Sequence, residues 1–200
     1  MSTDYKKLYD DLFASGYHDG DFTHSKVFFK DIEKFIANIQ NPKILDVGCA
    51  TGNAVSYFQK QNIECYGVDI SEVAISKCKG KKLDNCFPYP ANDLRFDKDL
   101  FDVVFSTEVL EHLATELSDR AISEIHRVCK TNGRVYLRIH LAREKNREYD
   151  KITSMHNLQD LHVNIKTEED WLKTLDQYFT KVEKRMDNKG SFYFIGDKKI

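Results

Sequence analysis

Two carboxylates and an imidazole stand close together at Glu108, Glu111 and His112, in the pattern E-x-x-E-H. If a helix begins at Glu108, these residues occupy positions i, i+3 and i+4 and share one of its faces. Mixed oxygen and nitrogen ligands suit a divalent cation such as Mg²⁺, Mn²⁺, Fe²⁺ or Zn²⁺. The alternative is that these side chains only orient neighbouring loops. The pattern therefore predicts either a metal site or a structural turn.

The stretch KILDVGCATGN places a carboxylate, Asp46, where a predicted strand turns into a glycine-containing loop. In an open parallel sheet, ligands bind at the carboxyl ends of the strands, and the first strand-turn-helix usually carries the contact. A dinucleotide fingerprint requires G-x-G-x-x-G, but Ala50 stands where the second glycine should be. Because Asp46 would also repel phosphates, the turn favours a ligand with a cationic end and no phosphate. S-adenosylmethionine has this character, whereas a nicotinamide oxidoreductase, the alternative, needs the missing glycine.

Acidic residues also follow the next two predicted strands. Asp69 lies 21 positions after Gly48, where a carboxylate can accept hydrogen bonds from both hydroxyls of a ribose. Asp93 and Leu94 are expected to follow a further strand, which lies between the strands predicted below at 63–69 and 101–106, and there an aspartate can reach an adenine amino group. The spacing from Gly48 to Asp69 suits NAD as well. These acidic residues therefore support binding of S-adenosylmethionine only when they are taken together.

These residues need a scaffold, and the apolar periodicity of the chain alternates between that of strands and that of helices. Near-continuous apolar strands indicate a mostly parallel sheet with helices on both faces. Asn132-Gly133 is expected to end the third crossover helix after Lys130. We expect strands at 43–48, 63–69, 101–106 and 134–141, and helices at 51–61, 71–82 and 116–130.

The two ends of the chain depart from this alternation. The first forty or so residues predict two helices, at 4–14 and 24–39, around a glycine-containing loop. The last part predicts an amphipathic helix at 167–179 and two strands, at 180–187 and 191–197, joined by a tight Asn-Lys-Gly turn. A C-terminal hairpin therefore completes the predicted α/β fold.

Composition limits the class of protein. The chain has 200 residues, of which 41% are hydrophobic, enough to fill the core of one domain. No apolar run reaches the ~18 residues that span a bilayer, and the N-terminus is polar, so we expect a cytoplasmic protein without a membrane span. Five cysteines without a C-x-x-C pair indicate buried thiols in a reducing compartment. A net charge of −2 with dispersed Lys and Arg argues against a nucleic-acid partner. The oligomeric state is left open.

The ordered motifs ILDVGCATGN, YGVDIS, NDLRF, FDVVFSTEVLEHL and NGRVYLRIHL resemble those of the class I S-adenosylmethionine-dependent methyltransferases, from Lys43 to about Leu141. The resemblance implies a seven-stranded, mostly parallel sheet whose last strand is antiparallel. It also implies that the N-terminal helices cover the donor as a lid, with help from Tyr5, Tyr9 and Tyr17; a solvated helix pair is the alternative. The expected single domain, 1–200, comprises a helical lid at 1–40, a donor-binding core at 43–141, an acceptor loop at 142–166 and a C-terminal helix and hairpin at 167–200.

Each part of the donor is expected to meet a different strand end. The resemblance implies that the glycine turn after Asp46 lines the methionine part of S-adenosylmethionine and that Asp69 binds the ribose. Asp93 and Leu94 would contact the adenine, while the carbonyl of Ser106 would hold the amino group. The full set expected to bind the donor is Asp46, Gly48, Cys49, Gly52, Asp69, Ile70, Asp93, Leu94 and Ser106.

The E-x-x-E-H pattern is similar to that of the small-RNA 3′-terminal 2′-O-methyltransferases and of ubiquinone-pathway O-methyltransferases. In the small-RNA enzymes a downstream histidine completes the pattern before an aromatic-containing helix, and His162 has a similar setting, with His156 close by. A metal there would lower the pKa of an acceptor hydroxyl and hold its oxygen in line with the methyl group. The metal ligands that the resemblance implies are Glu108, Glu111, His112 and His162.

Without a metal, His112 or His140 would act as the general base, and Glu108 is a further catalytic candidate. No N-P-P-Y-type tetrapeptide follows the fourth strand, which weakens methylation of amino groups. We therefore expect O-methylation of a sugar, a glycan or another small hydroxylated molecule, with or without a divalent metal. The alternatives are methylation of an RNA ribose 2′-hydroxyl and a non-catalytic module that binds S-adenosylmethionine.

Overall fold

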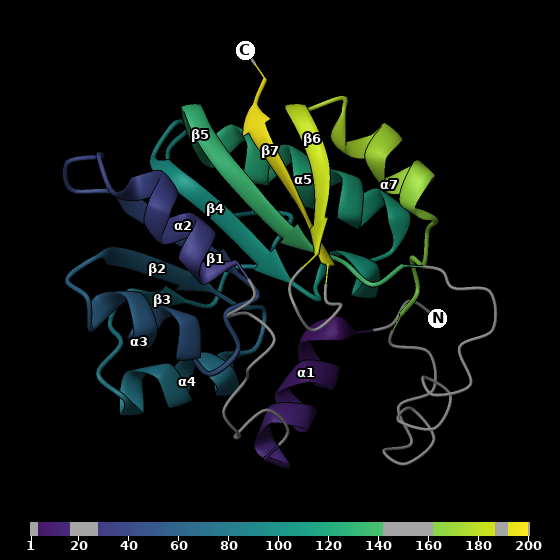
Figure 1. Ribbon diagram of the computed structural model, residues 1–200. Helices are drawn as coiled ribbons and strands as arrows, with labels where there is room; N and C mark the ends of the chain where they lie inside the picture. The colour runs from purple at the N-terminus through teal and green to yellow at the C-terminus, as the bar shows by residue number, and fades with distance from the viewer. Residues whose placement is uncertain (1–3, 17–27, 142–161, 187–191, 200) are drawn as a thin grey trace.

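The computed structural model describes residues 4–16, 28–141, 162–186 and 192–199 of the chain. Within them, helices cover a seven-stranded sheet (Figure 1). Its order is β3-β2-β1-β4-β5-β7-β6. The strands are β1 (Lys43–Val47), β2 (Glu64–Val68), β3 (Cys86–Phe87), β4 (Phe101–Thr107), β5 (Cys129–Arg138), β6 (Phe179–Met186) and β7 (Phe192–Lys198).

Strands β1 to β5 pair in parallel. Strand β7 is antiparallel to both β5 and β6 and lies between them, although it follows both in the chain. The prediction of a seven-stranded, mostly parallel sheet whose last strand is antiparallel is therefore confirmed. The turn predicted at 188–190 lies outside the described residues.

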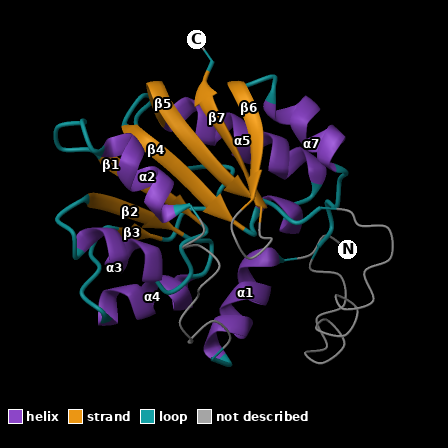
Figure 2. Cartoon of the chain, in the orientation of Figure 1, coloured by secondary structure: helices purple, strands orange, loops and turns teal. Residues whose placement is uncertain are grey.

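The helices lie on both faces of the sheet (Figure 2). Ser71 caps α4 by accepting a hydrogen bond from the N–H of Ala74 at 3.2 Å, and Thr167 caps α7 in the same way. The helices of the described residues are α1 (Tyr5–Ala14), α2 (Phe29–Ile36), α3 (Asn53–Gln59), α4 (Glu72–Gly80), α5 (Thr115–Val128) and α7 (Glu168–Leu175), with a 3-10 helix, η2, at Leu110–His112.

Two hydrophobic cores form because successive side chains of a strand point to opposite faces. Ile44 of β1 packs into one core together with α2, α3 and α4, whereas its neighbour Leu45 packs into the other core against α5 and α7. Phe58 and Trp171 are fully buried in the first and second core, respectively. With both faces covered, the strand ends are the part of the sheet left for binding a ligand.

Two predicted helix ends are wrong. The helix predicted at 167–179 ends at Leu175, and the third crossover helix ends before Lys130. Helix α5 ends at Val128, and strand β5 begins at once with Cys129, so Asn132-Gly133 does not end the helix. The two residues lie instead where the pairing of β5 with β4 shifts register, and Asn132 adopts a left-handed φ of 67°. An Asn-Gly pair suits a bulge as well as a helix end, because both need such backbone.

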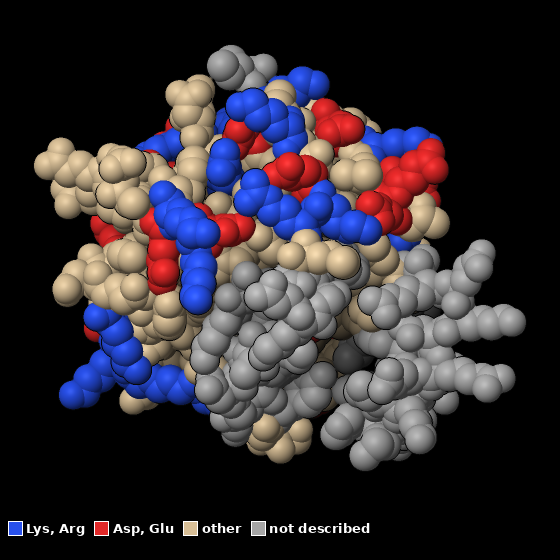
Figure 3. Space-filling model, in the orientation of Figure 1, with Lys and Arg blue, Asp and Glu red and all other residues tan. Residues whose placement is uncertain are grey.

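Charged side chains of both signs are interspersed on the face shown in Figure 3. The edge strand β6 illustrates this, because it exposes the acidic Glu183 between the basic residues Lys181 and Lys184. No basic patch dominates this view of the described residues, in keeping with the net charge of −2.

Candidate functional site

A cavity of about 250 Å³ opens at the carboxyl ends of β1, β2 and β4. Its floor is the turn after β1, one wall is the segment after β4, and helix α1 contributes Tyr5, Tyr9 and Phe13. The cavity therefore lies where ligands bind in parallel α/β sheets, at the edge where the strand ends meet.

The turn after β1 has unusual backbone. Gly48, Ala50 and Gly52 all adopt positive φ, at 84°, 48° and 77°. A Cβ atom at Gly48 would also overlap the side chain of Val109, so this position requires glycine for two reasons. The N–H groups of Gly48 and Cys49 donate to the carbonyl of Val68, which fixes the turn to the end of β2.

Asp69 ties the turn after β1 to the start of α4. Its carboxylate accepts hydrogen bonds from the N–H groups of Ala50 and Ser71, each at 2.9 Å. Burial raises the pKa of Asp69 to about 6. Burial, followed by the nearby charge of Asp69, also raises the pKa of Asp46 well above its usual value. Two carboxyl groups at this end of the cavity suit a ligand that brings hydrogen-bond donors or positive charge.

The structure brings together five of the residues predicted to bind the donor and leaves four outside the cavity lining. Those that line it are Asp46, Gly48, Cys49, Asp69 and Ile70. Of the others, Gly52 faces Cys78 and Leu83, and the Ser106 hydroxyl donates to the carbonyl of Val47.

The two predicted adenine contacts, Asp93 and Leu94, also lie outside the lining. Leu94 is buried in the second core with its N–H bonded to Glu124, while the Asp93 side chain is half exposed and pairs with Arg95 at 2.9 Å. The residues at this end of the cavity are instead Tyr89 and Ala91.

Sequence reasoning missed Tyr89, Ala91, Asn53 and Thr107, which all line the cavity. Tyr89 could have been predicted as an aromatic residue just after a strand. That strand, β3, has only two residues, and the apolar periodicity of the sequence did not reveal it. Tyr89 stacks on Phe87 of that strand, with ring centroids 5.4 Å apart.

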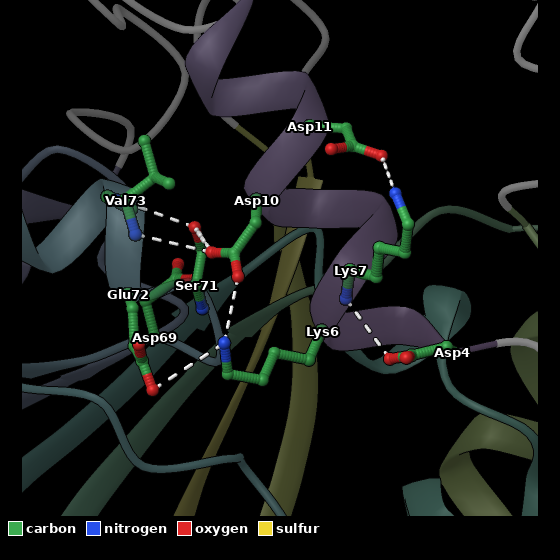
Figure 4. A network of polar contacts seen from close by, with 10 residues as sticks. Asp4, Lys6, Lys7, Asp10, Asp11, Asp69, Ser71, Glu72 and Val73 are labelled. Atoms are coloured by element: carbon green, nitrogen blue, oxygen red, sulfur yellow. Dashed lines mark hydrogen bonds and ion pairs between the residues drawn. The ribbon is translucent and has the colours of Figure 1, made fainter.

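Helix α1 is fastened over the cavity by polar contacts to α4. The Asp10 carboxylate accepts hydrogen bonds from the Ser71 hydroxyl at 2.7 Å and the Val73 N–H at 3.2 Å, and Lys77 Nζ donates to the carbonyl of Phe13. Figure 4 shows Asp10 pointing toward the first turn of α4, with Asp11 on the other side of α1. The two predicted lid tyrosines that are described, Tyr5 and Tyr9, therefore reach the cavity; Tyr17 lies outside the described residues.

The E-x-x-E-H segment does not form the predicted helix. Glu108 adopts a left-handed φ of 55°, and only Leu110–His112 form one turn of 3-10 helix. The Glu108 side chain pairs with Arg138 Nη2 at 3.1 Å. Glu108 thus lines the cavity but does not share a helical face with Glu111 and His112, because the break in the backbone changes its direction.

Glu111, His112 and His162 come together, and the two histidines line the cavity. One possible ligand atom from each lies within 4.8 Å of the others, and the Nε2 atoms of the two histidines are 3.2 Å apart. His140 stacks on His162, with ring centroids 5.0 Å apart, and donates its backbone N–H to Glu111 Oε1 at 2.9 Å. We call these four residues the acid–histidine cluster.

Burial dominates the electrostatics of the acid–histidine cluster. It raises the pKa of Glu111, which is fully buried, to about 8. Burial also lowers the pKa of His162 to about 3, helped by His112 and His140. The second carboxyl oxygen of Glu111, Oε2, is buried without a hydrogen-bond partner among the described residues. His156, noted above only as close to His162, and most of the predicted acceptor loop lie outside those residues.

Residues 45–137 match a family model described as a methyltransferase domain. A phosphoethanolamine N-methyltransferase from Plasmodium falciparum is 25% identical over 145 residues, covering 70% of this chain and 53% of that protein. A ubiquinone biosynthesis O-methyltransferase from Pelagibacter ubique is 29% identical over 103 residues, covering 50% of this chain and 42% of that protein. The chain spans about half the length of these two curated relatives.

The fold also has solved counterparts. The 1,6-didemethyltoxoflavin-N1-methyltransferase of Burkholderia thailandensis, with bound S-adenosylhomocysteine, superposes with a TM-score of 0.68 at 17% identity, covering 100% of this chain and 92% of that one. This likeness shows that the chain has a Rossmann-like methyltransferase fold. Among the described residues, no helix is long and apolar enough to cross a membrane.

Proposed function

We propose that this chain is an S-adenosylmethionine-dependent O-methyltransferase that acts on a hydroxyl of a sugar, a glycan or another small molecule. The observation that carries the proposal is the acid–histidine cluster, whose three histidines line the same cavity as Asp46 and Asp69. A hydroxyl must lose its proton as it attacks a methyl group, and imidazoles or a metal ion assist that loss. The cytoplasmic location predicted from the sequence stays a prediction.

The donor half of the proposal assigns one role to each acid. Asp46 faces the cationic amino acid end of S-adenosylmethionine, and Asp69 accepts hydrogen bonds from the ribose hydroxyls. Gly48, Cys49 and Ile70 bring backbone close to the ligand, and Tyr89 and Ala91 replace Asp93 and Leu94 beside the adenine. When bound, S-adenosylmethionine supplies an electrophilic methyl group.

The acceptor half of the proposal includes a divalent metal. Glu111 Oε2 is a buried carboxyl oxygen without a hydrogen-bond partner among the described residues, and the Nε2 atoms of His112 and His162 lie close together. Such a set fits a cation, because buried polar atoms are otherwise almost always satisfied. Glu111, His112 and His162 would hold the ion, which would lower the pKa of an acceptor hydroxyl. Glu108 is left out of this set because it pairs with Arg138.

The histidines divide between two tasks. Burial keeps His162 neutral, and neutral imidazole is the form that binds a metal. A group whose pKa is about 3 is a weak base, so His112 or His140 is the better candidate to take the acceptor proton if no metal takes part. The hydrogen bond from the His140 backbone N–H to the Glu111 carboxyl group ties the segment after β5 to the 3-10 turn and holds the cluster together.

A second candidate is N-methylation, because the relatives include a phosphoethanolamine and a phosphatidylethanolamine N-methyltransferase. An amine acceptor would also need to lose a proton, and the same histidines could receive it. The two candidates differ in the product, since one carries a new ether carbon and the other a new carbon on nitrogen.

The test is a transfer assay with S-adenosylmethionine carrying a ¹³C methyl group. The acceptors are a panel of monosaccharides, catechols and vicinal diols, with phosphoethanolamine as the amine comparison, each with Mn²⁺ and again with a chelator. A carbon shift typical of a methyl ether is the expected result, and loss of turnover in chelator would support the metal. A product methylated only on nitrogen or carbon would overturn the O-methyltransferase proposal.

A further inference from the structure

Three of the five cysteines come together beneath the turn that follows β1. Cys49 lies in that turn, Cys78 in α4 and Cys86 in β3, and their sulfur atoms lie within 4.8 Å of one another. All three residues are buried. We propose that these three thiols form a binding site for one thiophilic cation, Zn²⁺ or Cu⁺. We call them the thiol cluster.

The spacing of the sulfur atoms is close to that of a metal-bound set. Three thiolates at ~2.3 Å from one ion and spread evenly around it are roughly 4 Å apart. Since no two sulfur atoms are more than 4.8 Å apart, the thiol cluster would need to contract by at most about 1 Å. Thiolate sulfur selects thiophilic ions such as Cu⁺ and Zn²⁺ over Mg²⁺ or Ca²⁺. On binding, each thiol releases its proton, so three protons leave as three metal–sulfur bonds form.

A carbonyl oxygen stands beside the thiol cluster. The Ala50 carbonyl accepts hydrogen bonds from the Cys78 thiol at 3.4 Å and from the Cys49 thiol at 3.8 Å. This oxygen provides a fourth ligand for Zn²⁺, which is almost always tetrahedral in structural sites. Cu⁺ is satisfied by the three sulfurs alone, so the two ions would use the site differently.

Two glycines leave room for the sulfur atoms. A Cβ atom at Gly67, inside β2, would lie 2.8 Å from Cys49 Sγ, and one at Gly52 would lie 2.9 Å from Cys78 Sγ. The φ angle of Gly67 is not left-handed, so the backbone alone does not require glycine there. Glycine inside a strand commonly marks such a close approach. The thiol cluster is thus accommodated by residues of the neighbouring strand and turn.

An ion could reach the thiol cluster from the cavity, because Cys49 is part of the cavity lining. The remaining cysteines, Cys65 and Cys129, are equally buried but do not belong to the cluster. They serve as matched controls for the loss of a buried thiol. The proposal does not depend on the proposed methyl transfer, because it concerns only the metal ion that these sulfur atoms bind.

The experiment measures metal retained by reduced full-length protein after dialysis against Zn²⁺ or Cu⁺, in separate samples. A parallel titration with Cd²⁺ follows the ultraviolet charge-transfer band that only thiolate ligands give. The His162→Ala background removes a ligand of the acid–histidine cluster, so that it does not contribute bound Zn²⁺. Cys78→Ser and Cys86→Ser are compared with Cys65→Ser and Cys129→Ser, and circular dichroism checks that each variant is folded.

One ion per chain and a Cd²⁺ charge-transfer band are expected in the background protein and in both controls. Cys78→Ser and Cys86→Ser should each weaken binding by at least about 100-fold, since even outer-shell changes at metal sites cost 10–100-fold. Equal retention in all variants would show adventitious binding and overturn the proposal, as would absence of the band. If neither cluster variant folds, X-ray absorption of the Cd²⁺-loaded protein decides the matter, because the proposal requires three sulfur neighbours.

Discussion

After the function proposed above, we call the part of the site around Asp46 and Asp69 the donor end and the acid–histidine cluster the acceptor end. The two are built in different ways. At the donor end, Asp69 bonds to Ala50, 19 positions away, and to Ser71, two positions away. At the acceptor end, His162 meets His112 across 50 positions, and His140 meets Glu111 across 29. The donor end is thus a local strand-turn-helix structure, whereas the acceptor end depends on long-range packing.

This difference separates what each end should control. The donor end holds two buried carboxyl groups on backbone that is fixed to β2, which suits tight and general binding of one ligand. The acceptor end holds imidazole and carboxyl groups, and the function proposed above uses them to accept a proton or to bind a metal. Substitutions at the donor end should therefore change affinity for the donor, and those at the acceptor end should change turnover.

The largest effect is expected for His112→Ala. Under the proposed function this change removes either a metal ligand or the general base, so turnover should fall by about 10²–10⁴-fold. Affinity for S-adenosylhomocysteine, measured by calorimetry, should stay within about twofold. His126→Ala is the matched control, because His126 lies on α5 and contacts the carbonyl of Lys199, far along the chain from the cluster. If His112→Ala lost donor affinity by as large a factor as it lost turnover, the two ends of the site would not have separate roles.

Asp69→Asn should have the next largest effect. The amide can replace only part of the hydrogen bonding of the carboxylate, so we expect affinity for S-adenosylhomocysteine to fall about 10–100-fold. Asp93→Asn makes the same chemical change at an exposed residue paired with Arg95, and it should change affinity by less than about twofold. An equal loss in Asp93→Asn would instead favour the adenine contact predicted from the sequence.

The pH dependence of donor binding sharpens the same point. Burial raises the pKa of Asp69 to about 6, and the ionised carboxylate is the better acceptor for ribose hydroxyls. At pH 5 only about one tenth of this group is ionised, so affinity for S-adenosylhomocysteine should be about tenfold weaker than at pH 7.5. Calorimetry at both pH values checks this, and Asp69→Asn should lose most of the difference.

Stability should move in the opposite direction with pH. The folded-state pKa of Asp69 lies above the unfolded value of 3.8, so its contribution is fully present below pH 3.8 and is lost as the pH rises through about 6. Urea unfolding of the ligand-free protein between pH 4 and pH 7 should therefore show a flatter pH dependence in Asp69→Asn than in the wild type.

The smallest effect concerns the lid. Asp10→Asn weakens the bonds to Ser71 and Val73 that fasten α1 over the cavity, so donor affinity should fall by about three- to tenfold. The control is Asp11→Asn, which makes the same change at the next residue of the same helix. Within the described residues, the ion pair found for Asp11 is with the exposed Lys7. That control should bind the donor like the wild type. If both variants lose the same donor affinity, the loss comes from a less stable α1 helix and not from the specific contact of Asp10 with α4.

Much of the fold could be predicted because each element has a local cause. The apolar run of β1 and the capping residue Ser71 act over a few positions. The end of α5 was misplaced because Asn132-Gly133 satisfies two kinds of left-handed backbone, and only the pairing of β4 with β5 selects the bulge. Local signals do not contain that choice.

The site could be predicted less completely, for a similar reason. Asp46 and Asp69 follow strands and reach the cavity as expected. Asp93 was assigned from its position after a strand, but its side chain turns outward to Arg95, and Tyr89 lies nearer the strand end. His162 was found by resemblance and does meet His112, while Glu108 left the expected helical face because of one left-handed residue. Backbone angles of this kind are set by tertiary packing.

Strand β7 has a consequence for how the chain is made. It lies between β5 and β6 although both precede it, so β6 leaves the ribosome before the strand that must separate it from β5. The edge of β5 stays unpaired until Phe192–Lys198 have emerged, and unpaired edges readily bind other chains. Newly synthesised chains are therefore most prone to aggregation just before β7 inserts between β5 and β6. A chaperone that shields β5 would have its greatest effect at that time.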